Sequence, residues 1–438
     1  MGPYREERLN AARARTGGDV GVTEHGITDH GDGARHAVVL SGGGARGAYE
    51  IGVLQALFAG ECPATAGRPL QSRIFSGTSV GAFNAAFLAQ QANADAEAID
   101  RLTRIWRGRI ADTLGRCGNG VYRLRADPRR LVDPGCLRRP LELLGDLARD
   151  TLFWTGYAAV YGTQMLAADA PLRVRVLESF NLAALFSRGP LEALLADTID
   201  LACLRTSPSA LSVVATDWKH GRAIVFCKPD IVGRVGTDAI LASAAVPGIF
   251  MPVEIDGSPF VDGALLMNTP LKPAIRDGAD VLHVIYVDPT TGDLPFPDLP
   301  NTLDTFYRIY TILMATEINT DAMHIATIDE ELAERAGRGA APGNELPAVR
   351  AKRSIGLGRR GRERVREEKL YRPLVIHRYR PTAELGGAET FLDFSQPMID
   401  RMIRQGYEDA LSHDCRDAQC VLPPWAAPHR TGAPGELA

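Results

Sequence analysis

The sequence has no long apolar segment. Over its 438 residues, no stretch approaches the roughly 18 consecutive apolar residues that span a bilayer. Residues 1–36 are rich in Gly, Arg, Asp and His and lack the apolar core of a secretory signal peptide, so we expect them to form a disordered leader. These absences favour a cytoplasmic protein, or one that binds a membrane only peripherally.

A net positive charge is also absent. The chain carries 49 Lys and Arg against 53 Asp and Glu, a formal net charge of −4, and it has no basic motif with interleaved aromatic residues. Nucleic acid is therefore not an expected partner. One segment is an exception, because residues 350–372 carry ten Lys or Arg and three Glu, a local charge of +7. This segment has the charge to dock on anionic lipid, and it fits a solvated loop equally well.

Regularly spaced cysteines are absent as well. The seven cysteines are odd in number and scattered, which suits a reducing compartment better than a disulfide framework. His413, Cys415 and Cys420 lie close together in the sequence, but no second pair of ligands accompanies them. We therefore expect neither a metal site nor a cofactor.

Predicted strands and helices alternate along the chain, which indicates an α/β fold with a mostly parallel sheet. Helical insertions are expected at about 90–163 and 295–372, and residues 412–438 are expected to form a flexible tail. Apolar runs predict a final helix at 396–411 and strands at 37–40, 74–76, 211–216, 223–227, 281–288 and 374–379.

The first predicted strand runs directly into the glycine-rich stretch "SGGGARGAYE". Gly42, Gly44 and Gly47 spell GxGxxG, the fingerprint of a dinucleotide site. Such a site also needs an acidic residue at the end of the second strand to bind the ribose hydroxyls. The second strand here ends instead in "FSGTSVG", so the glycine loop is better suited to another negative charge.

The stretch "GTSVG" has the GxSxG pattern of a nucleophile elbow, with Ser79 between Gly77 and Gly81. A strand precedes it and a helix of small residues follows, which is the context that this motif requires. A serine that attacks a carbonyl creates an oxyanion, and the backbone N–H groups of Gly42–Gly44 are placed to stabilise that charge. Each motif alone is weak, but their occurrence on consecutive strands favours catalysis over two structural turns.

Serine catalysis also needs a base, and the histidines offer little motif context. Asp262 follows a short apolar run and precedes Gly263, a typical place for a catalytic side chain at a strand end. Asp-Gly is also the commonest turn dipeptide, so the segment alone leaves both interpretations open.

Together, "GGGARG", "GTSVG" and "DGA" resemble the three motifs of the patatin-like phospholipases, in the order found in that family. The resemblance covers most of residues 37–410 and is weakest at 90–163 and 295–372. It implies a patatin-like domain at 37–411, with a three-layer α/β/α sandwich, a mostly parallel central sheet and helical insertions.

The resemblance also implies roles for individual residues. Ser79 would be the nucleophile and Asp262 its partner in a dyad without histidine, while Gly42–Gly44 would form the oxyanion hole. Arg46 would support this loop, either as a brace or through substrate contact, and Gly47 completes the loop motif. The implied substrate is a fatty acyl ester of a phospholipid or related lipid, cleaved without a cofactor.

Contact with a membrane would follow from such a substrate. Trp154, Tyr157 and Tyr161 are of residue types that favour the headgroup boundary, although such a stripe is more often part of a core.

Two alternative functions stay open. One is an esterase with a Ser–His–Asp triad that uses His377, and the other is a non-catalytic nucleotide- or membrane-binding protein whose motifs are only turns.

Overall fold

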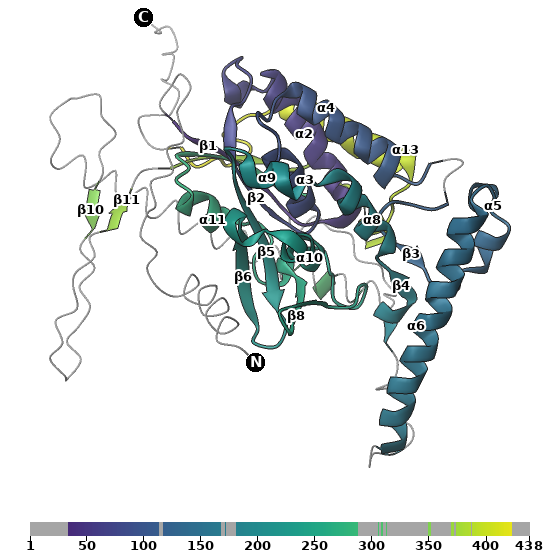
Figure 1. Cartoon of the computed structure of the whole chain (residues 1–438). Helices are drawn as coiled ribbons and strands as arrows, with labels where there is room; N and C mark the ends of the chain where they lie inside the picture. Colours follow the sequence, from purple (N-terminus) through teal and green to yellow (C-terminus); the bar gives the residue numbers. More distant parts are fainter. Residues whose placement is uncertain are drawn as a thin grey trace, which may run out of the picture.

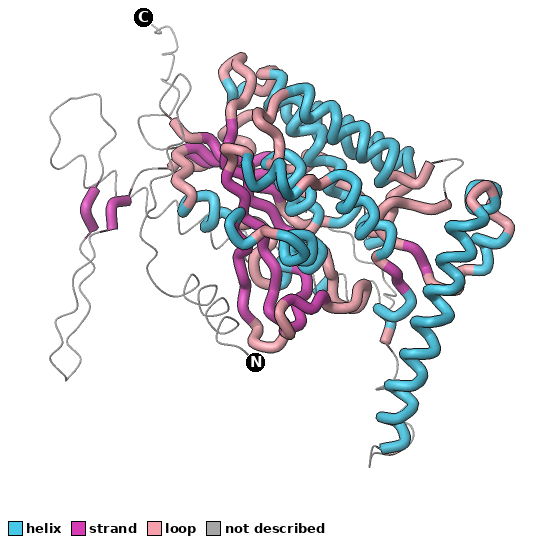
Figure 2. Tube along the Cα trace, in the orientation of Figure 1, coloured by secondary structure: helices cyan, strands magenta, loops and turns pink. Residues whose placement is uncertain are grey.

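The computed structural model describes residues 34–113, 117–167, 171, 181–287, 305, 308, 309, 312, 349–351, 369–371, 374–386 and 388–422. Strands form a central sheet, and helices lie on both sides of it (Figures 1 and 2). Most of the predicted leader, most of the second insertion and the end of the predicted tail lie outside the described residues. Within the described part of the chain, no helix is long and apolar enough to cross a membrane.

The central sheet has eight strands, and its first five in spatial order are parallel. The order is β12-β9-β1-β2-β5-β8-β7, with β6 also paired to β5. Strands β6, β7 and β8 are antiparallel to their neighbours. The strand bounds are His36–Leu40 (β1), Ser72–Thr78 (β2), Ala210–Asp217 (β5), Arg222–Cys227 (β6), Val253–Ile255 (β7), Ser258–Asp262 (β8), Val281–Ile285 (β9) and Val375–Tyr379 (β12).

Apolar residues bury both faces of the parallel part of the sheet. In β1, Val38 and Leu40 pack into the larger core, while Ala37 and Val39 pack into a second core on the opposite face. A parallel strand covered on both faces is a continuous apolar run rather than an alternating one. The run "AVVL" in β1 has this continuous pattern.

Helices complete a three-layer α/β/α arrangement. The larger core includes side chains from α2 (Gly47–Ala59), α3 (Val80–Ala89), α4 (Ala96–Ile105), α10 (Gly233–Ser243) and α13 (Gln396–Leu411), and the second core includes α11 (Leu271–Arg276). Helices α2 and α13 cross closely at two glycines. A Cβ at Gly52 would meet Ile403 O at 1.9 Å, and one at Gly406 would meet Tyr49 O at 2.1 Å.

The remaining elements lie around this body. They are α5 (Pro134–Leu137), α6 (Pro140–Ala167), α8 (Gly189–Thr198), α9 (Leu201–Thr206), and the two-stranded sheets β3 (Arg123–Leu124) with β4 (Phe186–Ser187) and β10 (Val349–Ala351) with β11 (Lys369–Tyr371). The long helix α6 projects from the body (Figure 1). Its Trp154, Tyr157 and Tyr161 are partly exposed and contact one another, so the expectation that they are core residues is wrong.

Two features of the fold differ from the cysteine and tail predictions. Cys117 and Cys136 form a disulfide, which corrects the expectation that the cysteines are unpaired. Scattered spacing could not reveal this pair, because the fold rather than the sequence brings them together. Residues 412–422, assigned to the tail, end in an antiparallel bridge between Val421 and Ile376 of β12.

Candidate active site

Ser79 lies at a sharp turn between β2 and α3. Its backbone angles are φ 56° and ψ −123°, a conformation that residues other than glycine rarely adopt. The Ser79 amide donates a hydrogen bond to Ser243 Oγ at 2.8 Å, which holds the turn in place. A Cβ at Gly77 would meet the Gly81 carbonyl oxygen at 2.2 Å, and one at Gly81 would meet Leu40 O at 2.5 Å. The two glycines of GxSxG are therefore a steric requirement of the turn.

Asp262 ends β8, and its carboxyl group is fully buried. Oδ1 accepts the Ala264 amide at 2.8 Å, whereas Oδ2 has no partner in hydrogen-bonding geometry. Burial raises the pKa of Asp262 from 3.8 to about 7, while the Ala264 amide and the nearby Ser79 hydroxyl lower it. We interpret the Ser79 contact as a close approach rather than a formed hydrogen bond, because Oδ2 is unpartnered. The position after Asp262 requires glycine, since a Cβ at Gly263 would meet Val214 O at 2.4 Å.

The glycine loop reaches Ser79 from the end of β1. A Cβ at Gly42 would lie 2.9 Å from Ser79 Cβ and 2.6 Å from Asn268 Oδ1, so only glycine allows this approach. The Gly42 amide donates to Asn268 Oδ1 at 2.9 Å and is therefore occupied. Among the described residues, the amides of Gly43 and Gly44 have no acceptor. They precede α2, whose N-terminal partial positive charge favours an anion.

Arg46 braces this loop against the C-terminal part of the chain. Its side chain is fully buried, Nε donates to Thr390 Oγ1 at 3.2 Å, and Nη2 donates to the Gly386 carbonyl at 3.0 Å. These contacts favour the bracing role over substrate contact. Gly47 is needed where α2 meets α3, because a Cβ there would lie 2.5 Å from Val80 Cγ2.

The segment 267–270 after Asp262 fastens the strand ends that carry the site. The role of this segment was not predicted, although its polar residues, a few positions after the DGA motif, were a signal. Asn268 positions the glycine loop through Gly42. Three hydroxyl groups also bond to the segment: Ser41 Oγ with Thr269 Oγ1 at 2.9 Å, Ser76 Oγ with Pro270 O at 2.9 Å, and Thr78 Oγ1 with Met267 O at 2.8 Å.

An apolar pocket adjoins Ser79. Ser79 supplies the polar side chain on a lining that is otherwise hydrophobic, apart from the backbone of Gly44. The lining includes Phe83, Trp106, Leu191, Ile240, Phe250 and Phe391. An electrophilic carbonyl placed at Ser79 would thus have an apolar wall beside it, which suits a hydrocarbon chain attached to that carbonyl.

A buried polar network supports the glycine loop and the Ser79 turn from within. Trp106 Nε1 donates to Asn84 Oδ1 at 2.9 Å, and Asn84 Nδ2 donates to Glu50 Oε2 at 2.8 Å. Glu50 is fully buried, and burial raises its pKa well above 4.5, although the Asn84 hydrogen bond lowers it. The network connects α2, which follows the glycine loop, with α3, which follows Ser79.

No histidine in the described part of the chain completes a triad at this site. Of the histidines that the structure describes, none forms a hydrogen bond with Ser79. His377 lies on β12, and strands β9 and β1 separate β12 from β2, which corresponds to about 14 Å at the usual strand spacing. His220 pairs with Asp217, Nδ1 to Oδ2 at 2.7 Å. The geometry therefore gives the His377 triad no support.

The chain has a sequence match to one protein family and a weak structural match to a solved protein. A solved structure of VipD from Legionella pneumophila matches with 14% sequence identity and a TM-score of 0.31, covering 86% of this chain. The match spans 66% of the length of that structure. The sequence model of the patatin-like phospholipases matches residues 38–275, more than half of the chain, and this range contains the glycine loop, Ser79 and Asp262. The chain belongs to the patatin-like phospholipase family.

Proposed function

We propose that this protein is a serine acyl hydrolase that cleaves fatty acyl esters of phospholipids or related lipids with Ser79 and Asp262 as its dyad. One observation carries the proposal. Ser79 is held in a strained turn beside a buried carboxyl group with a pKa of about 7, and an apolar pocket adjoins it. Strained serine and desolvated carboxyl groups cost stability, and they are typically retained where chemistry uses them.

In the first half of the proposed reaction, Asp262 accepts the hydroxyl proton of Ser79 while Oγ attacks the ester carbonyl. The amides of Gly43 and Gly44 donate to the resulting oxyanion, which is the interaction that strengthens most in the transition state. The intermediate collapses when the ester C–O bond breaks. The leaving alcohol takes the proton from Asp262, and the fatty acyl group remains on Ser79.

In the second half, water replaces the alcohol. Asp262 accepts a proton from this water, whose oxygen attacks the acyl-enzyme carbonyl, and the same two amides stabilise the second oxyanion. Breaking the bond to Oγ returns the proton to Ser79 and releases the fatty acid. The fully buried Asp262 suits both steps, because a raised pKa makes the carboxylate a stronger base than an exposed aspartate.

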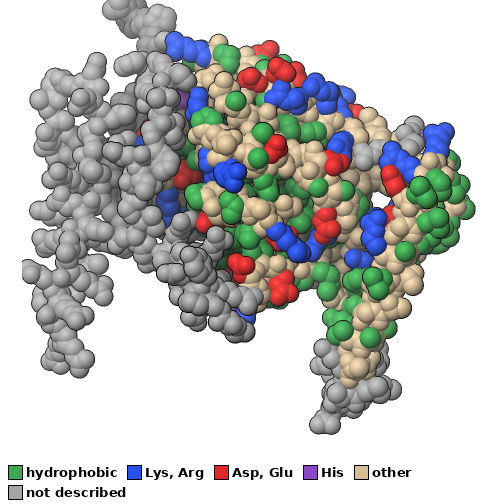
Figure 3. All heavy atoms as spheres, in the orientation of Figure 1, with side chains coloured by type: hydrophobic (Ala, Val, Ile, Leu, Met, Phe, Trp, Pro, Cys, Tyr) green, Lys and Arg blue, Asp and Glu red, His purple; other side chains and the backbone are tan. Residues whose placement is uncertain are grey.

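A peripheral membrane location is part of the proposal, and α6 supports it. Hydrophobic side chains gather over α5 and α6 (Figure 3). Large exposed residues on these helices are Leu137, Leu141, Leu144, Leu147, Leu152 and Val160, of which Leu141 is 84% exposed. Apolar side chains on a projecting helix gain free energy by entering the boundary between headgroups and acyl chains. The aromatic residues of α6 are suited to the same boundary.

The catalytic part is tested with a fluorescent fluorophosphonate and a soluble short-chain nitrophenyl ester, each with and without anionic phospholipid vesicles. Labelling and turnover should both vanish in Ser79→Ala, and turnover should fall at least 100-fold in Asp262→Asn. His220→Ala and His377→Ala should keep their turnover. Full activity in Asp262→Asn would exclude Asp262 as the partner of Ser79. A wild-type protein that shows neither labelling nor turnover with vesicles present would exclude the hydrolase function.

The membrane part needs a separate experiment. Leu141→Asp combined with Leu144→Asp should reduce co-sedimentation with vesicles but leave hydrolysis of the soluble ester unchanged. Leu411→Asp, at an exposed leucine at the end of α13, is the matched control and should bind vesicles as the wild type does. Unchanged vesicle binding by the α6 double variant would show that α6 is not the docking surface.

A further inference from the structure

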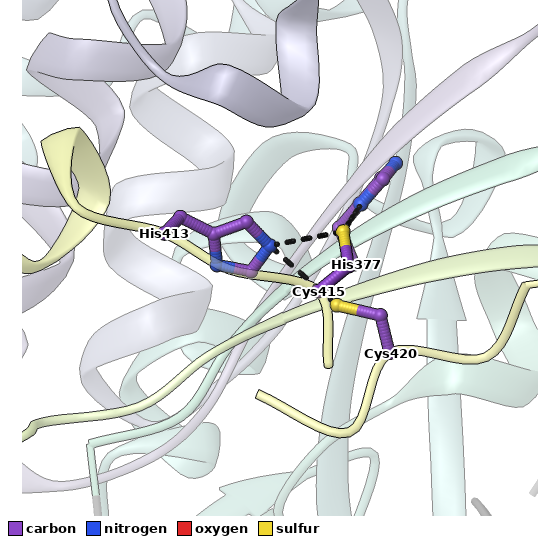
Figure 4. Close-up of side chains that lie close together, drawn as sticks. All are labelled: His377, His413, Cys415 and Cys420. Carbon is purple, nitrogen blue, oxygen red and sulfur yellow. Dashed lines mark hydrogen bonds between the residues drawn. The ribbon is translucent and has the colours of Figure 1, made fainter. Parts of the chain in front are cut away.

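Four metal-binding side chains meet where the C-terminal segment passes the edge strand of the sheet (Figure 4). His377 lies on β12, whereas His413, Cys415 and Cys420 follow α13. Their ligand atoms all lie within 4.8 Å of one another. No metal site was predicted here, because no second pair of ligands accompanies His413, Cys415 and Cys420 in the sequence. The fold supplies the missing fourth ligand from a distant strand.

The distances between the potential ligand atoms approach those of an occupied tetrahedral site. Cys415 Sγ lies 3.4 Å from His377 Nδ1 and 3.5 Å from His413 Nε2, and Cys420 Sγ lies 3.5 Å from the same His413 nitrogen. With bonds of about 2.3 Å to sulfur and about 2.0 Å to nitrogen, tetrahedral zinc places neighbouring ligand atoms about 3.3 to 3.8 Å apart. Small side-chain rotations would therefore admit the ion.

The backbone already holds the ligands together. Ile376 and Val421 exchange two hydrogen bonds of 2.9 Å, which fix the end of the C-terminal segment beside His377. The Cys420 amide donates to the Cys415 carbonyl at 2.9 Å and closes the loop between the two thiols. The intervening residues 416, 417 and 419 are exposed, whereas the four potential ligands are at least partly buried. This loop presents its thiols inward and its polar side chains to solvent.

Neighbouring groups orient the ligands. The Arg378 amide donates to Cys420 Sγ at 3.3 Å, a contact that supports a thiolate. The His377 ring stacks on His283 with centroids 5.2 Å apart, and the Tyr379 ring lies 4.6 Å from that of His413. Both histidines are therefore packed in defined positions, as expected for metal ligands with a supporting second layer of contacts.

We propose that His377, His413, Cys415 and Cys420 bind one Zn²⁺ ion as a structural site. Two thiolates and two neutral imidazoles are a common structural zinc ligand set, and four protein ligands leave no position for a reactive water. The thiols release their protons to solvent as the two Zn–S bonds form, and the two thiolates balance the charge of the ion. Zinc would fasten the segment after α13 to the edge strand β12.

The test uses the purified full chain, freed of metal with a chelator in reducing buffer and titrated with Co²⁺. One equivalent should produce the visible bands of tetrahedral cobalt and a thiolate-to-cobalt band in the near ultraviolet, and one equivalent of Zn²⁺ should displace them. The thermal unfolding midpoint should rise by several degrees on zinc binding. Cys203→Ser, at an exposed cysteine outside the cluster, is the matched control and should behave as the wild type.

Two variants keep the proposal falsifiable. Cys415→Ser combined with Cys420→Ser should lose both sets of bands. Cys420→His retains four ligands, so it should keep the tetrahedral bands while the charge-transfer intensity per cobalt falls by about half, since one thiolate remains. No tetrahedral spectrum in the reduced wild type, or an unchanged spectrum in the double serine variant, would overturn the proposal. Peptide mapping that finds a Cys415–Cys420 disulfide in freshly isolated, metal-free protein would assign the thiols to a redox pair instead.

Discussion

Asn84 donates a hydrogen bond of 2.8 Å to Glu50 and thereby joins the helix behind the glycine loop to the helix behind Ser79. Glu50 is fully buried, and its pKa is raised well above 4.5 chiefly by that burial. The native state therefore retains a proton that the unfolded chain releases once the pH exceeds the unfolded value. Glu50 consequently lowers the free energy of unfolding progressively as the pH rises from about 4.5 toward its folded pKa.

Glu50→Gln removes this cost and keeps the shape of the side chain. The difference between its unfolding temperature and that of the wild type, measured by calorimetry, should therefore shift upward from pH 5 to pH 8. Glu50→Ala should instead lose about 2–4 kcal/mol at pH 5, because it leaves a cavity and an unpaired Asn84 amide, and less at pH 8, where it also removes the cost of keeping Glu50 neutral. If the stability of Glu50→Gln relative to the wild type instead falls from pH 5 to pH 8, Glu50 is not neutral in the native state.

Asp262 should govern the pH dependence of hydrolysis. As a base it must be deprotonated, so kcat/KM for a soluble ester should rise tenfold per pH unit below its pKa of about 7 and level off above it. Activity at pH 5 should then be about 100-fold below the plateau. A profile that stays flat from pH 5 to pH 8 would exclude Asp262 as the titrating base.

The same shift has a consequence for folding. Because the pKa of Asp262 is raised in the native state, its ionisation destabilises the fold as the pH rises from about 4 to about 7. Asp262→Asn should accordingly unfold at a higher temperature than the wild type at pH 8, while the difference becomes small near pH 3. Inactivity combined with higher stability would distinguish the loss of a functional group from misfolding.

Gly42→Ala should displace the oxyanion loop while leaving every reacting group chemically unchanged. The new Cβ would lie 2.6 Å from Asn268 Oδ1 and 2.9 Å from Ser79 Cβ, so the loop must move. Since displacement of an oxyanion donor commonly costs about 100- to 1000-fold in kcat, we expect a loss of that order with little change in KM. Gly156→Ala is a control for added bulk, because a Cβ there meets nothing within 4 Å and the φ of Gly156 lies outside the left-handed region. A Gly42→Ala variant with wild-type kcat would exclude this role for the loop.

Ser79→Gly should relieve strain at the elbow. Ser79 has a φ of 56°, which glycine adopts without penalty, so the variant should gain about 1 kcal/mol in the free energy of unfolding. Ser79→Ala keeps the strained Cβ and should not show this gain, although both variants abolish labelling. Equal stabilities of the two variants, measured by denaturant unfolding, would indicate that the turn stores no strain.

Local signals predicted most of the fold. The final helix at 396–411 has the predicted bounds. The strand at 374–379 differs from β12 by one residue at its start, and the strand at 211–216 differs from β5 by one residue at each end. Continuous apolar runs identify interior strands because both faces are buried. Strand β7 was missed, since three residues in a hairpin give too short a pattern.

The site was predictable only where its residues lie in compact motifs. Ser79 and the glycine loop are each contained in one turn, so their spacing carries the signal. Asn268, Ser243 and Phe391 contribute from separate segments, and only the fold brings them to Ser79. The fourth side chain of the His–Cys cluster, His377, was hidden for the same reason.

Arg46 places a limit on how the chain can be shortened. Its guanidinium group is fully buried and bonds to Thr390 and to Gly386, far beyond the end of the family match at residue 275. A recombinant fragment that stops there would keep Ser79 and Asp262 but lose β9 and β12, which leaves β1 with an open edge. An unpaired interior strand of this kind templates intermolecular pairing, so such a fragment should aggregate rather than fold.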